Sequence, residues 1–429
     1  MGWILTLFYF ALILVFLPRL GFVKRSGLDS IEIRILFSLK VGAGLFLWAI
    51  YHYYYGNDRV TADAFRFFDD ALIIYSVVAT DPMVYLKILL GLDMSDPQVV
   101  AVVDQMNNWY KPYNQGVYND NQSIIRFNAL SMILSFGYFQ VHTVLINLLS
   151  FLGMLAIYRV LKKELMLPKY LLLITVFLIP QVLLWSSGVL KEPLLFFSLG
   201  LFFFALWHIF RYRALNVLNS LAALIGLTGL LLVKNYILLC LLPSLVFLIS
   251  LSVFRHWRAW QAAILSLLIC LVSFFVLSSI PQIGLLDKLV SKQVNFIRLG
   301  IMSDSGSYFE IPKLSPDIWS FLSSSPEAFM NTSLRPFLWN ASSILELFSS
   351  IEALVISLIF LLTMIFANHR KMWNSDIMIF SLLFFLSLFI LIGWVTPVAG
   401  AIVRYKIPVL IFAVPCFVNF LIPAIREKI

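Results

Sequence analysis

The sequence predicts an all-α integral membrane protein that crosses the bilayer about eleven times. Of its 429 residues, 61% are hydrophobic and only 12% are charged, and the mean hydropathy is +0.93. A soluble domain carries about 25% charged residues, so this composition excludes a soluble enzyme, a secreted disulfide scaffold and a disordered chain. The three cysteines lie in apolar runs without metal-binding spacing and are expected to pack as small hydrophobic side chains.

Each predicted span is an apolar run of about 20 residues, which is the length that crosses the hydrocarbon core. The runs cover residues 3–18, 36–55, 138–158, 168–185, 193–210, 215–233, 236–254, 261–280, 344–366, 376–396 and 407–425. We expect them to form a single membrane domain, residues 1–429.

The charge distribution predicts the orientation of these spans. With the N-terminus outside and the C-terminus in the cytoplasm, the inner segments hold 17 of the 31 Lys and Arg residues but 5 of the 22 acids. Their balance is then +12, against −3 for the outer segments. Short basic inner loops follow the positive-inside rule, so the net charge of +9 needs no nucleic-acid partner.

Two long loops then fall outside, at residues 56–137 and 281–343. The first is rich in Asp, and its apolar stretches at 84–92 and 123–134 predict amphipathic helices on the membrane surface. The aromatic and amide-rich segment 107–114 has two interpretations. It holds a sugar between flat rings and amides, or it is a polar loop with aromatic anchors at the interface.

The first loop carries the candidate general base. Asp63, Arg66 and Asp70 are spaced i, i+3 and i+7, so they share one face of a helix. A carboxylate there can accept a proton from a hydroxyl while Arg66 tunes its pKa; a solvated Asp–Arg pair is the alternative. Asp69 beside Asp70 is a weak candidate for a divalent cation. No other metal site and no other cofactor is predicted.

Cationic side chains beside the outer ends of spans predict an anionic ligand such as phosphate, because charge near the bilayer core is costly. The predicted phosphate-binding residues are Lys191, Arg335, Arg404 and Lys406. Further candidates are Glu192, Lys234 and Tyr405. Lysines at helix ends also snorkel to the interface without any ligand, and this alternative fits Lys234 and Lys406.

These segments resemble bacterial membrane proteins of exopolysaccharide and O-antigen synthesis, the Wzy-type polymerases with their EpsG-like group, and the related GT-C glycosyltransferases. Residues 61–67 resemble the Gly-x-Asp-x-x-x-aromatic stretch of the EpsG-like group, with Ala62 near the usual Gly and Phe67 in place of the usual Tyr. Arg404-Tyr405-Lys406-Ile407-Pro408 resembles the Arg-Tyr-x-x-Pro of GT-C enzymes. The acidic loop follows the second span rather than the first, which favours the polymerase-like group.

The resemblance implies a glycosyltransferase of the bacterial inner membrane that uses polyprenyl-phosphate- or pyrophosphate-linked sugars at its outer face. Its partners would be a polyprenyl-linked saccharide, the lipid bilayer and other membrane proteins of polysaccharide assembly. Asp63 would be the base or would orient the acceptor, and Lys191, Arg335 and Arg404 would stabilise the leaving phosphate. A carrier of lipid-linked sugar, such as a flippase, is the second hypothesis, and a non-catalytic assembly partner is the third.

Overall fold

A computed structural model describes residues 1–56, 59, 62–110, 119–280, 282, 284–302, 306–341 and 343–426, the last three without their side chains. Throughout this part the chain is helical, and no strand forms beyond one isolated antiparallel bridge between Tyr308 and Val398. Thr61 and residues 111–114 of the predicted segments lie outside the described residues.

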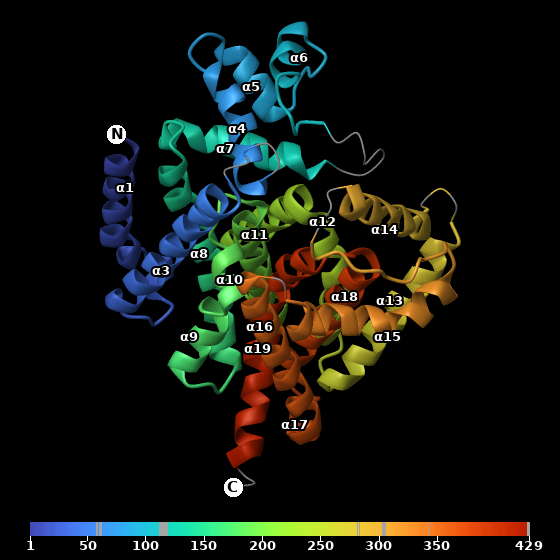
Figure 1. Ribbon diagram of the computed structural model, residues 1–429. Coiled ribbons are helices and arrows are strands. Elements are labelled where there is room, and N and C mark those ends of the chain that lie inside the picture. The colour runs from blue at the N-terminus through green and yellow to red at the C-terminus, as the bar shows by residue number, and fades with distance from the viewer. Residues whose placement is uncertain are drawn as a thin grey trace. The chain divides into compact units, whose positions relative to one another are not determined.

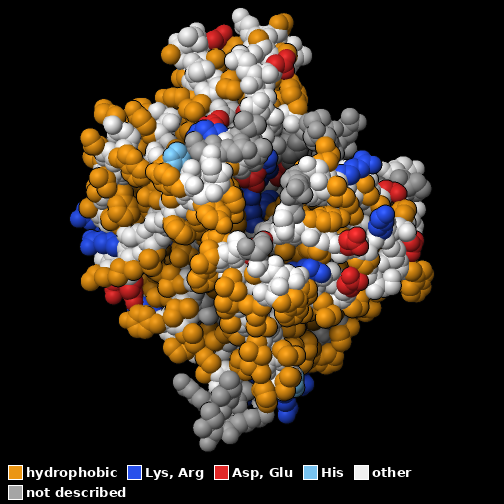
Figure 2. Space-filling model, in the orientation of Figure 1, with side chains coloured by type: hydrophobic (Ala, Val, Ile, Leu, Met, Phe, Trp, Pro, Cys, Tyr) orange, Lys and Arg blue, Asp and Glu red, His pale blue; other side chains and the backbone are white. Residues whose placement is uncertain are grey.

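Nine helices in the described part are long and apolar enough to cross a membrane (Figure 1). They are α1 (Gly2–Phe16), α3 (Ser30–Ala49), α8 (Phe139–Glu164), α11 (Lys191–Leu206), α12 (Val217–Val253), α13 (Ala259–Ser278), α16 (Ile344–Phe366), α18 (Asp376–Val395) and α19 (Ala399–Arg426). Hydrophobic side chains cover most of the face seen in Figure 2, as expected for surfaces that contact lipid. The prediction of a multi-pass all-α membrane protein is therefore confirmed.

The difference between eleven predicted runs and nine long helices has two local causes. The run 168–185 divides into α9 (Lys169–Phe177) and α10 (Pro180–Trp185), since Pro180 lacks the N–H that would continue a helix. The runs 215–233 and 236–254 join in α12, where Lys234 alone has non-helical angles of φ −151° and ψ 80°. Its two segments, 217–233 and 235–253, are each about 25–28 Å long.

One residue that we assigned to the inner charges, Lys40, lies within a helix. A capping box starts α3, in which the Asp29 carboxylate accepts from Glu32 N–H and the Glu32 carboxylate accepts from Asp29 N–H. Lys40 consequently lies in the middle of α3 and is completely buried. Without it, the inner segments keep 16 basic residues, and the direction of the charge asymmetry is unchanged.

The chain divides into two compact units, which we describe separately. The first comprises residues 1–159, 183–203 and 221–235. Besides long helices it contains α2 (Gly21–Lys24), α4 (Asp63–Ser76), α5 (Pro82–Leu90), α6 (Pro97–Val103) and α7 (Asp120–Ser135), of which α4 to α7 group together in Figure 1. The stretches 84–92 and 123–134 are thus largely helical, as predicted, in α5 and α7.

Glycines allow close packing of the long helices in the first unit. A Cβ on Gly200 of α11 would strike the backbone of Gly153 in α8, and a Cβ on Gly153 would strike that of Phe196. Gly226 and Gly229 of α12 lie against Phe202 and Ser198 of α11 in the same way. Small residues at such contacts let helix backbones approach and gain van der Waals contact, which is how membrane helices associate.

The second unit comprises residues 160–182, 204–220 and 236–429. Within the range predicted as the second outer loop, the chain forms α14 (Leu285–Met302) and α15 (Ile318–Leu334). Helix α15 packs along α18, where the Thr332 hydroxyl donates to the Phe389 carbonyl at 2.7 Å and a Cβ on Gly393 would meet the Ala328 backbone. The second loop therefore contributes a helix to the interior of this unit.

Three helix ends of the second unit meet at Glu164, the last residue of α8. A π-helical turn, Trp207–Arg211, ends α11 and lets the Tyr212 N–H donate to the Trp207 carbonyl, five residues back. Trp207 Nε1 and Tyr212 OH then both donate to Glu164 Oε1, at 3.0 and 2.5 Å. Arg211 pairs with Asp376 at the start of α18, at 2.7 Å. The charge distribution predicts that all three helix ends lie on the inner side of the membrane. Their mutual contact is consistent with a location on the same side.

Candidate functional site

The predicted base stands at the start of a helix. Asp63 is the first residue of α4, where the helix dipole favours a negative charge. Its Oδ1 pairs with Arg66, and the two side chains are 27% and 30% exposed, respectively. The predicted Asp63–Arg66 pair therefore forms, and both groups remain within reach of a ligand.

Lys191 joins this pair through an aromatic ring. Arg66 Cζ lies 4.7 Å from the centroid of Phe67, and Lys191 Nζ lies 4.9 Å from the same centroid. Phe67 is buried, and a cation against an aromatic face is stabilised by the quadrupole of the ring. The ring thus fills the position where the resemblance expects a tyrosine and contacts two cations.

The first residues of α7 neutralise Lys191. Its Nζ pairs with Asp120 Oδ2 at 2.7 Å and donates to Asn121 Oδ1 at 2.8 Å. We call Asp63, Arg66, Phe67, Asp120, Asn121 and Lys191 the Phe67 site. Asp120 and Asn121 are not among the residues that the sequence pattern predicts for the site. The signal for them was Asn119, whose side chain caps α7 and so marks where the helix begins.

Asp70 is connected to the Phe67 site by hydrogen bonds. Its carboxylate accepts from the backbone N–H groups of Asn107 and Asn108, at 3.1 and 2.8 Å, and the Asn108 carbonyl accepts from Asn121 Nδ2 at 3.1 Å. Burial raises the pKa of Asp70, while the hydrogen bonds from Asn107 and Asn108 act in the opposite direction. Asp70 is thus linked to Lys191 through two asparagines, Asn108 and Asn121.

Asp69 and the aromatic loop have structural partners. Asp69 accepts from Arg59 Nε at 2.9 Å, so Asp69 and Asp70 point to different groups and do not form a cation site between them. Over the residues that the structure describes, no group of three metal-ligating side chains gathers. Trp109 is buried beneath Arg126, whose Cζ lies 5.1 Å from the ring, so it offers no open face to a sugar.

Glu192 and Lys234 form a buried ion pair next to Lys191 in the chain. The Lys234 ammonium donates to Glu192 Oε1 at 2.6 Å, and the two side chains are 6% and 0% exposed, respectively. The pair joins the first turn of α11 to the interruption in α12. A buried pair of this kind requires both partners, because either charge alone would be costly to bury.

The remaining predicted cations lie in the second unit. Arg335 follows α15, with its Cζ 3.7 Å from the Phe309 centroid and 4.8 Å from that of Phe337, and its Nε donates to Asn331 Oδ1 at 2.9 Å. Lys406 is buried in α19, and its Nζ lies 3.4 Å from the Thr332 carbonyl. Its burial removes Lys406 from direct contact with a ligand in this arrangement.

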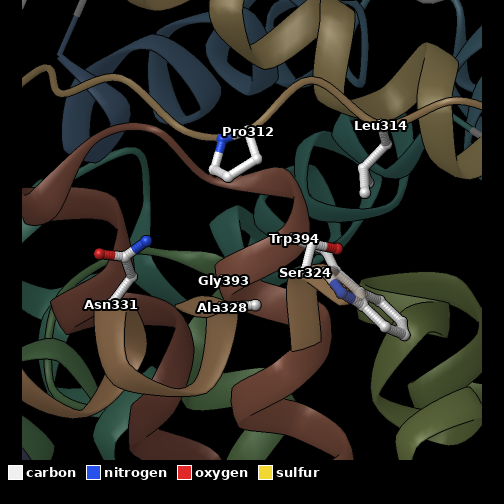
Figure 3. A pocket seen from close by; sticks show the side chains of 7 residues that line it. All are labelled: Pro312, Leu314, Ser324, Ala328, Asn331, Gly393 and Trp394. Atoms are coloured by element: carbon white, nitrogen blue, oxygen red, sulfur yellow. The ribbon is translucent and has the colours of Figure 1, made fainter. Parts of the chain in front are cut away.

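Arg404 and Tyr405 are half-buried at the start of α19. The Tyr405 ring meets those of Tyr236 and Phe296 edge-on, with centroids 6.3 and 6.1 Å apart. A small cavity of about 10 Å³ beside the middle of α15 is lined by Pro312, Asn331 and Trp394, among others (Figure 3). It has room for about one water molecule, which is far too little for a sugar.

The fold and these buried polar networks define a multi-pass α-helical membrane protein. Comparison of the chain with protein-family models, curated proteins and solved structures found no match in any of the three.

Proposed function

We propose that the protein is a membrane glycosyltransferase that uses polyprenyl-phosphate- or pyrophosphate-linked sugars, and that the Phe67 site is part of its active site. The observation that supports this most is the Lys191–Phe67–Arg66 arrangement, with the partly exposed carboxylate of Asp63 beside it. A base for an acceptor hydroxyl and cations for a leaving phosphate are the groups that such a transfer requires.

Two carboxylates occupy the cations of the site, and a phosphate could take the place of a carboxylate. Asp63 neutralises Arg66 and Asp120 neutralises Lys191, so the cations are held in place before any ligand arrives. A phosphate that replaces Asp120 on Lys191 gains a charge-assisted hydrogen bond and releases a carboxylate that is 26% exposed. In this proposal Arg335 and Arg404 of the second unit also bind phosphate.

The decisive experiment is chain extension in proteoliposomes that contain the purified protein and a polyprenyl-pyrophosphate-linked oligosaccharide. We expect Asp63→Asn to lower the rate about 100-fold or more, as for loss of a general base, and Arg335→Ala to lower it as well. Asp93→Asn is the matched control, because Asp93 is an exposed loop aspartate paired only with Lys87. Unchanged extension in Asp63→Asn and Arg335→Ala would remove this site assignment.

The same vesicles separate the enzyme from a carrier. Movement of the lipid-linked sugar across the bilayer without any extension would favour the carrier hypothesis. The Phe67 site contains two acids and two cations, which suits transfer chemistry as well as binding.

The proposal places the Phe67 site on the outer face of the bacterial inner membrane, with the N-terminus outside. Cysteine labelling in cells tests this, in a Cys270→Ser background because Cys240 and Cys416 are buried. A membrane-impermeant thiol reagent should label Asp93→Cys in intact cells and Arg370→Cys only after permeabilisation. The reverse pattern would place the site on the cytoplasmic face.

A further inference from the structure

The chain between α10 and α11 is not helical, although its side chains are buried. Helix α10 ends at Trp185 and α11 begins at Lys191, so residues 186–190 form a break that we call the α10–α11 break. Ser186, Ser187, Val189 and Leu190 are all buried. Buried non-helical backbone leaves carbonyl groups without helical partners, and each must find a donor elsewhere.

Lys40 of α3 supplies donors to this break. Its ammonium donates to the Ser186 carbonyl at 3.1 Å, to Ser186 Oγ at 2.7 Å and to Ser187 Oγ at 3.2 Å. Met154 Sδ lies 3.5 Å away on the remaining side. The side chain is completely buried, and over the described residues no carboxylate lies within ion-pair distance of it. The Lys40 amino group is therefore surrounded by neutral hydrogen-bond acceptors, of which three are oxygen atoms of the break.

Helix α8 completes the same set of bonds. Ser150 Oγ donates to the Ser186 carbonyl at 2.8 Å, and Asn147 Nδ2 donates to the Ser187 carbonyl at 2.7 Å. Gly44, one turn after Lys40, has no Cβ because the Ser187 carbonyl occupies that space. The break is therefore held from two helices, and Lys40 is the only charged group among its partners.

The break connects α3 to both parts of the Phe67 site. Leu47 of α3 forms a buried cluster with Ala64 and Leu190. Ala64 follows Asp63, and Leu190 precedes Lys191, so one helix fixes the neighbours of the candidate base and of the candidate phosphate-binding lysine. A shift of the break along α3 would move Lys191 relative to Asp63.

We propose that Lys40 is a positioning residue, which locks the α10–α11 break so that Lys191 stays against Phe67 and Asp120. The catalytic consequence of this proposal rests on the proposed function, whereas the structural consequence does not. Removal of the ammonium leaves the Ser186 and Ser187 hydroxyls without their donor and the Ser186 carbonyl with Ser150 Oγ alone. The break then opens independently of the helices around it.

Hydrogen exchange of the purified full-length protein tests the structural part without any sugar. In Lys40→Met, we expect the backbone amides of residues 186–191 to exchange about tenfold faster, which corresponds to about 1.4 kcal/mol of local stability. Exchange in α5 and α6 should stay unchanged. Ser198→Ala is the matched control, because Ser198 is a buried serine of α11 that donates to Leu194 and does not contact the break.

Two further variants keep the test decisive if Lys40→Met fails to fold. Ser186→Ala removes one acceptor of the ammonium and should speed exchange in the break to a smaller extent. Lys40→Arg keeps the charge and should restore most of the protection. Unchanged exchange at residues 186–191 in both Lys40→Met and Ser186→Ala would overturn the proposal, as would equal acceleration over the whole chain.

Chain extension then tests the catalytic part. A displaced Lys191 loses contact with the leaving phosphate in the transition state, so Lys40→Met should lower kcat about tenfold or more while KM changes little. Lys40→Arg should recover part of kcat. Faster exchange with no detectable extension by the wild-type protein would overturn the proposed function and leave the locking role of Lys40 standing. Faster exchange with unchanged kcat would overturn the link from Lys40 to Lys191.

Discussion

Arg66 and Lys191 contact the same aromatic ring, although 125 positions separate them in the sequence. Each cation also has its own carboxylate, Asp63 for Arg66 and Asp120 for Lys191. The ring keeps two like charges at fixed places, while the carboxylates balance them in the absence of a ligand. Such an arrangement is ordered before binding, which lowers the cost of ordering side chains around an anion.

The shared ring predicts an energetic coupling between Phe67 and Lys191. In a double-mutant cycle of Phe67→Leu with Lys191→Met, we expect a coupling of about 0.5–2 kcal/mol in the free energy of unfolding in detergent. Phe68→Leu is the control, since Phe68 is equally buried but packs on Phe139 and His142 rather than on a cation. Equal coupling in the two cycles would show that the ring acts by packing alone.

The buried Glu192–Lys234 pair should be sensitive to the loss of either partner. Glu192→Gln or Lys234→Met alone leaves one buried charge uncompensated, and we expect each to lower the free energy of unfolding by about 3–5 kcal/mol. The double variant Glu192→Gln with Lys234→Met removes both charges and should recover more than half of this loss. Thermal unfolding of the purified variants measures both effects, and strictly additive losses would contradict the pairing.

Asp70 and Asp96 should respond to pH in opposite directions. Burial raises the pKa of Asp70 above its ordinary value of 3.8, so its contribution to stability is complete below pH 3.8 and is lost as the pH rises through the raised pKa. The hydrogen bond from Lys87 lowers the pKa of Asp96, so its contribution is complete above pH 3.8 and is lost as the pH falls through the lowered pKa.

The two matching Asp→Asn variants make this measurable. The stability of the wild-type protein relative to Asp70→Asn should decline as the pH rises above 3.8, whereas its stability relative to Asp96→Asn should decline as the pH falls below 3.8. Unfolding followed across this range in one buffer series gives both slopes. Slopes of the same sign would refute the assignment of Asp70 as a buried carboxyl group.

The contact between α8 and α11 predicts a strong effect of a single methyl group. Gly200→Ala places a Cβ against the Gly153 backbone, and we expect it to lower the free energy of unfolding by about 1–3 kcal/mol or to displace α11. Gly42→Ala is the control, because nothing lies within 4 Å of its Cβ position in α3. It should be neutral or stabilising by up to about 1 kcal/mol. Equal behaviour of the two variants would contradict this close approach.

Composition and hydropathy were enough to predict the class of the protein. Any α-helix that crosses a lipid bilayer must be long and apolar, whatever the function of the protein. The spacing of Asp63 and Arg66 also predicted a real ion pair, since i and i+3 side chains are neighbours on any helix. The apolar runs on either side of Lys234 and at residues 168–185 were found as well. How each run is interrupted depends on backbone angles that hydropathy does not report.

Contacts between segments that are far apart in the chain could not be predicted from the sequence. Lys40 was assigned to the inner charges although the predicted run 36–55 contains it, because hydropathy does not show that the capping box at Asp29 starts α3 well before this residue. The hydrogen bonds from Asn107 and Asn108 to Asp70 could not be predicted either, because the i, i+3, i+7 spacing reports the face of α4 but not the loop that covers it. Asp120 gave no chemical signal alone, since its role depends on a lysine 71 residues further along the chain.

The interruption at Lys234 also bears on how the protein is made. Glu192 is synthesised 42 residues before its partner, so α11 carries an uncompensated carboxylate when it first reaches the membrane. The first segment of α12 must follow before Lys234 arrives, and a lone charge costs up to about 2.5–3.5 kcal/mol on insertion scales, the value for the centre of a span. We therefore expect α11 to integrate stably only after Lys234, in the middle of α12, has been synthesised. The two segments would then enter the bilayer together during translation.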